Sequence, residues 1–459
     1  MISLLKFSLG IFSGKHAPVE GEHYYHLRMA RTLLDNGKRP ARDDMSWLPT
    51  GIPGNYYPPM LHYVEAAMLF LLSRFGLKGR DARIHGCLAF IFLLLVALGL
   101  SMITRRGGFV EVALLLFSSP LILERYVCGG IRGEMVALIL LPILFFVCAT
   151  PESILFPLAL PVLLIGIGFS TRTSAYIFLS VALWSILWIP ASGLIPAVAG
   201  LETLLIWLFC LRWYRVRGKN FYPFRELRWS GCSLKSETDA LILDHRKDRV
   251  ISLEERPQHF FHLVLSAPCV LAGLFLVPYA TLPLERFCAI FLVLSSLYSL
   301  FARRYLVYAL LPAIVLITSK AALFSPLVFA ILLNQVFICL HADVRPTQDT
   351  MEAIDFIRKD GGDRNSLVIA PWRLGHLITG YGGMKAFWDS NFPGTKRFMA
   401  QKAILDQIVS GELSVDTLFQ NVKKASKVFL LLELPGGNEI RKGFREMAKV
   451  STYIILIPQ

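Results

Sequence analysis

Four acidic residues lie near the edges of apolar segments, where their carboxylates could bind a cation. Glu22 opens a polar segment, and Asp43 lies further along that segment. Glu134 follows a Gly-rich bend, and Glu254 shortly precedes Pro257 at the start of an apolar run. Carboxylate oxygens are ligands that Mg²⁺ and Mn²⁺ prefer. Simpler interpretations stay open, because Glu22 and Glu134 could cap helices and Glu254 could lie in a solvated turn.

Arginines beside the same segments have the chemistry to bind a phosphate. Arg303 and Arg304 separate two apolar runs, and Arg132 lies two residues before Glu134. A guanidinium engages phosphate or pyrophosphate through paired hydrogen bonds. Arginines at these positions could equally anchor helix ends at a membrane surface.

Aromatic, basic and acidic side chains lie close together in one segment of the C-terminal quarter, VIAPWRLGHLITGYGGMKAFWDSNFPG. Trp372, Arg373 and His376 come first, and a second Trp and an Asp follow a Gly-Gly bend. Trp and His in a folded domain usually pack into its core. Because so many aromatic and charged residues occur together, a ligand-facing loop is an equally good interpretation.

The elements that would hold these residues are mostly apolar. The chain has 459 residues, of which 54% are hydrophobic and 17% charged, and its mean hydropathy is +0.54. Apolar runs of roughly 17 residues or more recur between 86 and 340, the length that crosses a bilayer. This pattern predicts a polytopic α-helical membrane protein. In a membrane protein the net charge of +14 favours anionic lipid or phosphate over nucleic acid as a partner. The sequence contains no CxxC pair, so no zinc site is expected.

We expect about 11 spans, counting an abbreviated first one within residues 1–12. Residues 58–75 are amphipathic and carry His62 and Glu65, so this stretch is expected to lie along the membrane interface. Another helix is expected from Glu22 to Asn36. The remaining spans are expected at 86–104, 109–124, 135–150, 153–169, 173–189, 192–211, 259–280, 286–301, 305–318 and 321–340.

The alternation of spans predicts a transmembrane domain over 1–341 whose external loops are 14–85, 125–134 and 212–258. The short loops on the opposite face carry Arg and Lys, which is typical of a cytoplasmic face. The long loops and everything after His341 are therefore expected to be extracytoplasmic.

The composition changes after His341. Residues 342–459 are expected to form a small soluble α/β domain, with a helix at 349–359 and strands at 366–370 and 427–432.

Taken in order, these motifs resemble the catalytic subunit of oligosaccharyltransferase, a GT-C-type glycosyltransferase. The opening family motif D-P-Y-Y-H-L-R corresponds to Glu22–Arg28, and D-P-x-S-W corresponds to Asp43–Trp47. The motif G-x-x-D-x-D falls on Gly129–Glu134, the external-loop acid on Glu254, and W-W-D-Y-G-H on Pro371–His376. The resemblance spans nearly the whole chain.

The resemblance implies roles for individual residues. Glu22, Asp43, Glu134 and Glu254 would surround Mn²⁺ or Mg²⁺, with Glu22, Glu134 and Glu254 acting in catalysis. The donor phosphate would lie against Arg304, helped by Arg303 and Arg132. Trp372, Arg373 and His376 would contact the acceptor.

Two departures from the family pattern affect this expectation. Arg132 stands where the family has its first Asp of the second motif, and Arg373 replaces the Asp of W-W-D. A guanidinium has no hydrogen-bond acceptor, so Arg373 cannot accept the hydroxyl proton of a sequon Ser or Thr.

We expect transfer of a glycan from a polyprenyl-phosphate or pyrophosphate donor, with protein asparagine as the favoured acceptor. A lipid, glycan or different peptide acceptor is the alternative. A non-catalytic binder of polyprenyl-linked lipid is a second alternative.

Overall fold

The computed structural model describes most of the chain. Its described residues are 21–46, 51–53, 59–75, 81–104, 108–117, 119, 122, 132–171, 175–216, 234–235, 241–244, 249–252, 268–299, 305–320, 348–371, 374–389, 395–410, 426–433, 444–450 and 453–458. The expectations for residues 1–12 and 321–340 lie outside these ranges.

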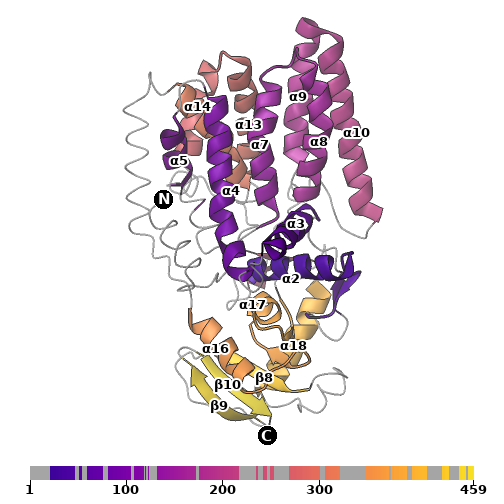
Figure 1. Cartoon of the computed structure of the whole chain (residues 1–459), viewed down its shortest axis with the longest axis vertical. Coiled ribbons are helices and arrows are strands. Elements are labelled where there is room, and N and C mark those ends of the chain that lie inside the picture. The colour runs from indigo at the N-terminus through magenta and orange to yellow at the C-terminus, as the bar shows by residue number, and fades with distance from the viewer. Residues whose placement is uncertain are drawn as a thin grey trace.

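A bundle of helices fills one end of the molecule (Figure 1). Every span expected between 86 and 318 overlaps one of its helices. They are α4 (Asp81–Ile103), α5 (Phe109–Phe117), α7 (Glu134–Cys148), α8 (Leu155–Ser170), α9 (Ala175–Ser192), α10 (Leu194–Val216), α12 (Pro268–Leu276) with the 3-10 turn η3 (Val277–Tyr279), α13 (Pro283–Ser299) and α14 (Leu306–Ser319). Among the described residues, one stretch, Leu194–Trp213, is long and apolar enough to cross a bilayer, and the other apolar helices are shorter. The number of spans therefore stays a prediction.

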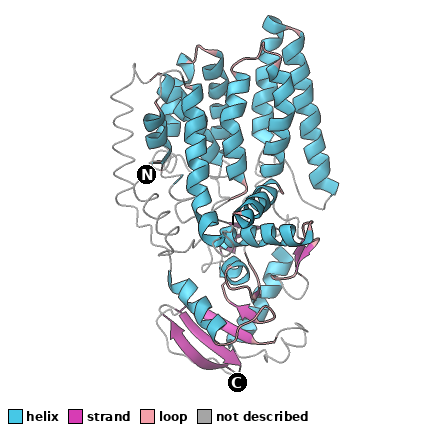
Figure 2. Cartoon of the chain, in the orientation of Figure 1, coloured by secondary structure: helices cyan, strands magenta, loops and turns pink. Residues whose placement is uncertain are grey.

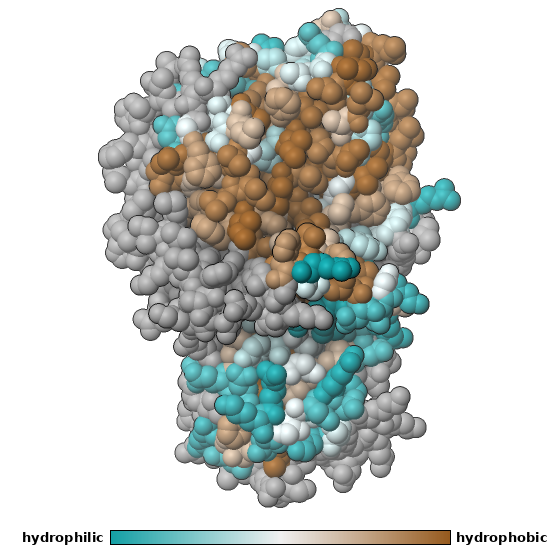
Figure 3. Space-filling view, in the orientation of Figure 1, coloured by the Kyte–Doolittle hydropathy of each residue, from teal (hydrophilic) through white to brown (hydrophobic). Residues whose placement is uncertain are grey.

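The bundle is apolar outside as well as inside. Its interior is a continuous core of Leu, Val, Ile, Phe and Tyr side chains. Its outer face exposes further large apolar side chains, including Val162 at 73%, Leu201 at 58% and Leu205 at 56% exposure. Figure 3 shows this apolar surface spread over the bundle and replaced by polar residues toward the C-terminal end. An exposed apolar surface of this extent is what a bilayer covers.

Two helices cross beneath the bundle, between it and the C-terminal domain (Figure 1). Helix α2 (Gly21–Asn36) confirms the helix expected at these residues. Helix α3 (Met60–Arg74) buries His62 and Glu65, and its opposite face exposes Tyr63 and Leu71. The structure thus gives α3 the two-sided character that motivated its prediction as an interfacial helix.

The C-terminal part is the predicted α/β domain, whose strands Figure 2 shows gathered at the end away from the bundle. Its five strands have the order β7-β6-β8-β10-β9, in which β6 runs parallel to β7 and β8 while β10 runs antiparallel to β8 and β9. The strands are β6 (Leu367–Ile369), β7 (Lys385–Ala386), β8 (Val428–Glu433), β9 (Phe444–Val450) and β10 (Tyr453–Pro458), and the helices are α16 (Gln348–Lys359), α17 (Gly375–Gly380) and α18 (Thr395–Ser410). The helix expected at 349–359 and the strands expected at 366–370 and 427–432 are confirmed within a residue or two.

The stretch 212–258, expected as a polar loop, contains regular structure. Strands β3 (Leu234–Lys235), β4 (Leu241–Asp244) and β5 (Arg249–Ser252) form a small antiparallel sheet. The apolar and β-branched residues of β4 and β5 favour strands despite the polar composition around them. Helix α10 also extends to Val216, beyond its expected end.

The opening segment, residues 21–53, packs onto the C-terminal domain. Tyr24 belongs to the hydrophobic core of that domain, and Gly380 of α17 lies so close to Tyr24 that an added Cβ would overlap its backbone. The amide of Ala386 in β7 donates to the carbonyl of Met45 at 2.8 Å. Arg397 of α18 donates to the carbonyl of Gly51 at 3.0 Å. Segments from the two ends of the sequence thus form one structural unit beneath the bundle.

Candidate active site

A buried ion pair joins α2 to the short hairpin that follows it. The hairpin pairs β1 (Arg42–Asp43) with β2 (Ile52–Pro53), and Asp43 is opposite Ile52. Arg28 donates from its two terminal nitrogens to the two carboxylate oxygens of Asp43, at 2.8 and 2.7 Å. The amide of Met45 also donates to Asp43, at 3.2 Å. Asp43 would have to share or give up these hydrogen bonds to bind a cation.

Electrostatics favours this pair over an isolated charge. Burial alone would lower the pKa of Arg28, but the carboxylate of Asp43 more than offsets it, so the pKa lies above its ordinary value. The paired geometry is the one in which a guanidinium and a carboxylate bind most strongly. The hairpin is therefore held against α2 by charge as well as by backbone bonds.

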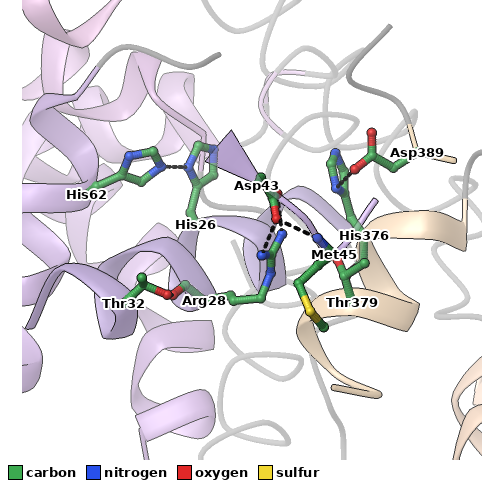
Figure 4. Close-up of polar contacts among 9 residues, drawn as sticks. All are labelled: His26, Arg28, Thr32, Asp43, Met45, His62, His376, Thr379 and Asp389. Atoms are coloured by element: carbon green, nitrogen blue, oxygen red, sulfur yellow. Dashed lines mark hydrogen bonds and ion pairs between the residues drawn. The ribbon is translucent and has the colours of Figure 1, made fainter. Parts of the chain in front are cut away.

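A second buried group surrounds Tyr25 of α2, and Figure 4 draws its other members, His26, His62, His376 and Asp389. His26 of α2 and His62 of α3 are hydrogen-bonded, with 2.9 Å between Nδ1 of His26 and Nε2 of His62. The Tyr25 ring contacts both histidines, and also His376 of α17, with ring centroids 5.1 Å apart. His376 lies 3.3 Å from Asp389, measured from Nδ1 to Oδ2. One set of polar side chains thus connects α3, α2 and the C-terminal domain.

The acid and the arginine of the second motif lie at the start of α7. Glu134 is in the first helical turn and half-buried, and Arg132 is buried just before it. Between them, Gly133 approaches the carbonyl of Ser170 at the end of α8. Helix α3 contacts both α7 and α8. Arg132 and Glu134 therefore lie near the end of α8, at the end of the bundle close to α3.

The first turn of α14 lies at an end of the bundle where tyrosines gather. Tyr176, at the start of α9, contacts Tyr298, Tyr305 and Tyr308 from the end of α13 and the start of α14. Since α9 follows α8 directly, this is the same end of the bundle at which α7 begins. Several predicted site residues lie outside the part of the chain that the structure describes: Glu254, Arg303, Arg304, Trp372, Arg373 and the side chain of Glu22.

Comparison with solved structures decides the fold. No protein-family model and no curated protein sequence matches the chain. The oligosaccharyltransferase AglB from Archaeoglobus fulgidus, in complex with an inhibitory peptide and a dolichol-phosphate, is similar with a TM-score of 0.55 at 12% identity, over 94% of this chain and 69% of that one. ArnT from Cupriavidus metallidurans is similar with a TM-score of 0.54 at 12% identity, over 99% of this chain and 97% of that one. The chain has the GT-C fold.

The GT-C fold agrees with the expected fold class, and its solved examples here are integral membrane proteins. At this level of identity the likeness establishes the architecture alone. The acceptor and the chemistry have to be argued from the residues of this chain.

Of the four acids that the resemblance places around a cation, Asp43 and Glu134 are the two whose side chains the structure describes. Among the described residues, no group of three or more His, Cys, Asp or Glu side chains is arranged to hold a metal ion. Asp43 accepts hydrogen bonds from Arg28 at both oxygens. The set Glu22, Asp43, Glu134 and Glu254 therefore stays a prediction, with Asp43 its least available member.

Sequence reasoning missed the residues that build the interior of the site. Arg28, Tyr25, His62 and Asp389 had no assigned role, although all four are buried or nearly so. The partners His26 and His62 are 36 residues apart, and Tyr25 and His376 lie in different domains of the sequence. The available signals were His62 and Glu65 on an otherwise apolar stretch, the motif Glu22–Arg28, and Asp389 in the dense C-terminal cluster.

Proposed function

We propose that this chain is a membrane glycosyltransferase that moves a glycan from a polyprenyl-phosphate or polyprenyl-pyrophosphate donor to an acceptor, on the extracytoplasmic face. One observation carries the proposal: a GT-C fold and the motif order of oligosaccharyltransferase catalytic subunits occur in the same chain. A solved neighbour that holds a dolichol-phosphate supports the donor class. Protein asparagine is the acceptor that the motif order favours.

The proposed roles are those that the family resemblance implies. Glu22 and Glu254 orient the N–H groups of an acceptor amide, and Glu134 supplies a carboxylate at the bundle end where α7 begins. Mn²⁺ or Mg²⁺, held by Glu22, Glu134 and Glu254 with or without Asp43, would stabilise negative charge on the departing phosphate. Arg304, Arg303 and Arg132 would hold that phosphate. Trp372, Arg373 and His376 would meet the acceptor.

The decisive variant is Glu134→Gln, which keeps the shape of the side chain and removes its charge. Transfer should fall at least about 100-fold, the usual effect of removing one charge-stabilising group. The assay uses membranes, a polyprenyl-linked glycan and a fluorescent peptide with an Asn-Val-Thr sequence. Glu111→Gln is the matched control, because Glu111 is an exposed acid in the first turn of α5. Full activity of Glu134→Gln would refute the role of this acid.

The cation has its own test. Chelation should abolish transfer and Mn²⁺ or Mg²⁺ should restore it, and Glu134→Gln should raise the Mn²⁺ concentration needed for half-maximal recovery. Activity that survives thorough chelation would remove the cation from the proposal.

A GT-C enzyme with an acceptor other than a sequon is the second candidate, and two observations favour it. Arg373 replaces the expected acid in the acceptor motif, and a cation there suits an anionic acceptor. The chain also matches nearly the full length of ArnT but 69% of AglB. Arg373→Asp should improve use of the Asn-Val-Thr peptide if asparagine is the acceptor, and unchanged use would favour the second candidate. Donor binding without turnover, at any cation concentration, would indicate a non-catalytic lipid binder.

A further inference from the structure

The buried group around Tyr25 connects three elements through five polar side chains. Tyr25 and His26 belong to α2, His62 to α3, His376 to α17, and Asp389 follows β7. All five are at most 2% exposed. Burial of so many polar groups is costly unless they interact, and here they form consecutive contacts from His26 to Asp389.

The backbone of the C-terminal domain is shaped to complete this group. An added Cβ on Gly375 would lie 2.5 Å from the Cβ of Asp389, so only glycine allows α17 to approach the segment that carries Asp389. That segment is fixed by Trp388, whose indole nitrogen donates to the carbonyl of Ala370 at 2.6 Å. Asp389 is thus held with Oδ2 3.3 Å from Nδ1 of His376, where its charge can orient the imidazole.

Protonation affects the His26–His62 hydrogen bond and the Tyr25 phenol in different ways. In the His26–His62 pair one ring donates to the other, so the hydrogen bond needs one nitrogen without a proton. If both rings carry two N–H groups, neither can accept and the pair separates. The phenol of Tyr25 stays neutral, because burial, and then the nearby charge of Asp43, raise its pKa well above its ordinary value.

The charged groups around the pair come from every neighbouring element. Glu65 is buried one turn after His62 on α3, and Arg28 of α2 lies over the Tyr25 ring at 5.6 Å. Asp43, Arg39 and Asp389 also act on Tyr25. The ionisable groups around the network are therefore of both kinds, three acids and two arginines.

We propose that His62 and Asp389 are positioning residues at the two ends of one network, which couples the α2–α3 pair to the acceptor-side helix α17. The inference rests on the proposed function, since it assigns the network to the placement of His376 toward the acceptor. Neither residue contacts the reacting atoms. Each acts through the rings between them.

The first test needs no substrate. In the full-length protein, His62→Ala should speed hydrogen exchange in α17 by about tenfold, because a buried hydrogen bond is lost at the far end of the network. His62→Gln keeps a donor and an acceptor that do not titrate and should restore slow exchange. Tyr63→Ala is the matched control, since Tyr63 is the next residue on α3 and 53% exposed. Unchanged exchange of α17 in His62→Ala would overturn the proposal.

A double-mutant cycle tests the coupling itself. His62→Ala and Asp389→Asn should each raise exchange in α17, and together they should raise it by less than the product of the two effects. The pair Tyr63→Ala and Asp389→Asn should give the simple product. A simple product for His62 and Asp389 would mean that they act independently, and the network would be refuted.

Kinetics connect the network with the reaction. With the Asn-Val-Thr peptide and a polyprenyl-linked glycan, His62→Ala should raise the acceptor KM about tenfold and change kcat less than about twofold. His62→Gln should restore the wild-type KM. A kcat effect without a KM effect, or a KM in His62→Gln as high as in His62→Ala, would refute positioning. Coupled exchange without any transfer by the wild-type protein would overturn the proposed function and leave the network supported.

Discussion

At the scale of single residues, the structure distinguishes two of the acids that were expected to hold a cation. Asp43 is engaged by Arg28 at both oxygens, whereas Glu134 is half-buried in the first turn of α7 beside the buried Arg132. A carboxylate with two charged hydrogen bonds is stable where it is, and its main effect is to hold the hairpin against α2. The carboxylate of Glu134 has the chemistry to bind a cation, and the guanidinium of Arg132 has the chemistry to bind a phosphate.

Removing Arg28 should therefore be a stability mutation before it is an activity mutation. Arg28→Ala leaves the carboxylate of Asp43 buried without its partner, which should destabilise the fold by about 3 kcal/mol. A thermal melt of the detergent-solubilised protein would show this as a lower midpoint. Lys38→Ala removes an exposed cation just after the same helix and should leave the midpoint unchanged. Equal midpoints for wild type and Arg28→Ala would show that the ion pair contributes nothing.

At the scale of elements, short connections in the C-terminal domain hold neighbouring strands together through side-chain hydrogen bonds. Asp363 lies between α16 and β6, and it accepts from Ser366 at 2.7 Å and from Ser426 at 2.6 Å. Ser426 lies just before β8, which pairs in parallel with β6. One exposed carboxylate thus links the starts of two neighbouring strands.

This link gives a defined pH dependence. The hydroxyls of Ser426 and Ser366 hold the pKa of Asp363 below its ordinary value. Because the folded-state pKa is the lower one, the carboxylate stabilises the fold above the unfolded pKa, near pH 4, and the effect is lost as pH falls through the folded pKa. Thermal midpoints measured from pH 6 to pH 3 should fall less steeply in Asp363→Asn than in wild type. Glu352→Gln, an exposed change on α16, should follow the wild-type curve, and identical curves for all three proteins would contradict the link.

At the scale of the whole molecule, α2 and the C-terminal domain share one hydrophobic core. Tyr24 is 2% exposed and lies in a core made otherwise of residues from 351 to 455. Its ring contacts Tyr381 with centroids 5.4 Å apart. The C-terminal domain is therefore completed by a residue from the opening segment, and its position relative to the bundle is tied to α2.

A mutation near the N-terminus should accordingly loosen the C-terminal sheet. Tyr24→Ala removes a large buried ring, which typically costs about 3–5 kcal/mol, and exchange of the amides in β6 should accelerate more than exchange in α8. Tyr63→Ala, which removes an exposed tyrosine from α3, should change neither. Unchanged exchange in β6 would show that the C-terminal domain is stable without Tyr24.

Local sequence patterns predict many of the helices and strands of this architecture. Apolar runs predict the bundle helices because burial in lipid or protein requires continuous apolar surface. The periodicity from Glu22 to Asn36 predicts α2, and the helix and strands of the C-terminal domain follow from patterns within a few residues. The sheet at residues 234–252 was not predicted, because a polar composition outweighed its short apolar strands.

The sequence by itself determined the segments of the fold, their order and the charges available at the expected site. The tertiary structure alone decided which of those charges meet. Asp43 meets Arg28 across 15 residues, and His26 meets His62 across 36. Tyr25 reaches His376 from the other end of the chain. Local patterns report which surface of an element is buried, whereas a pair of polar groups depends on how two elements cross.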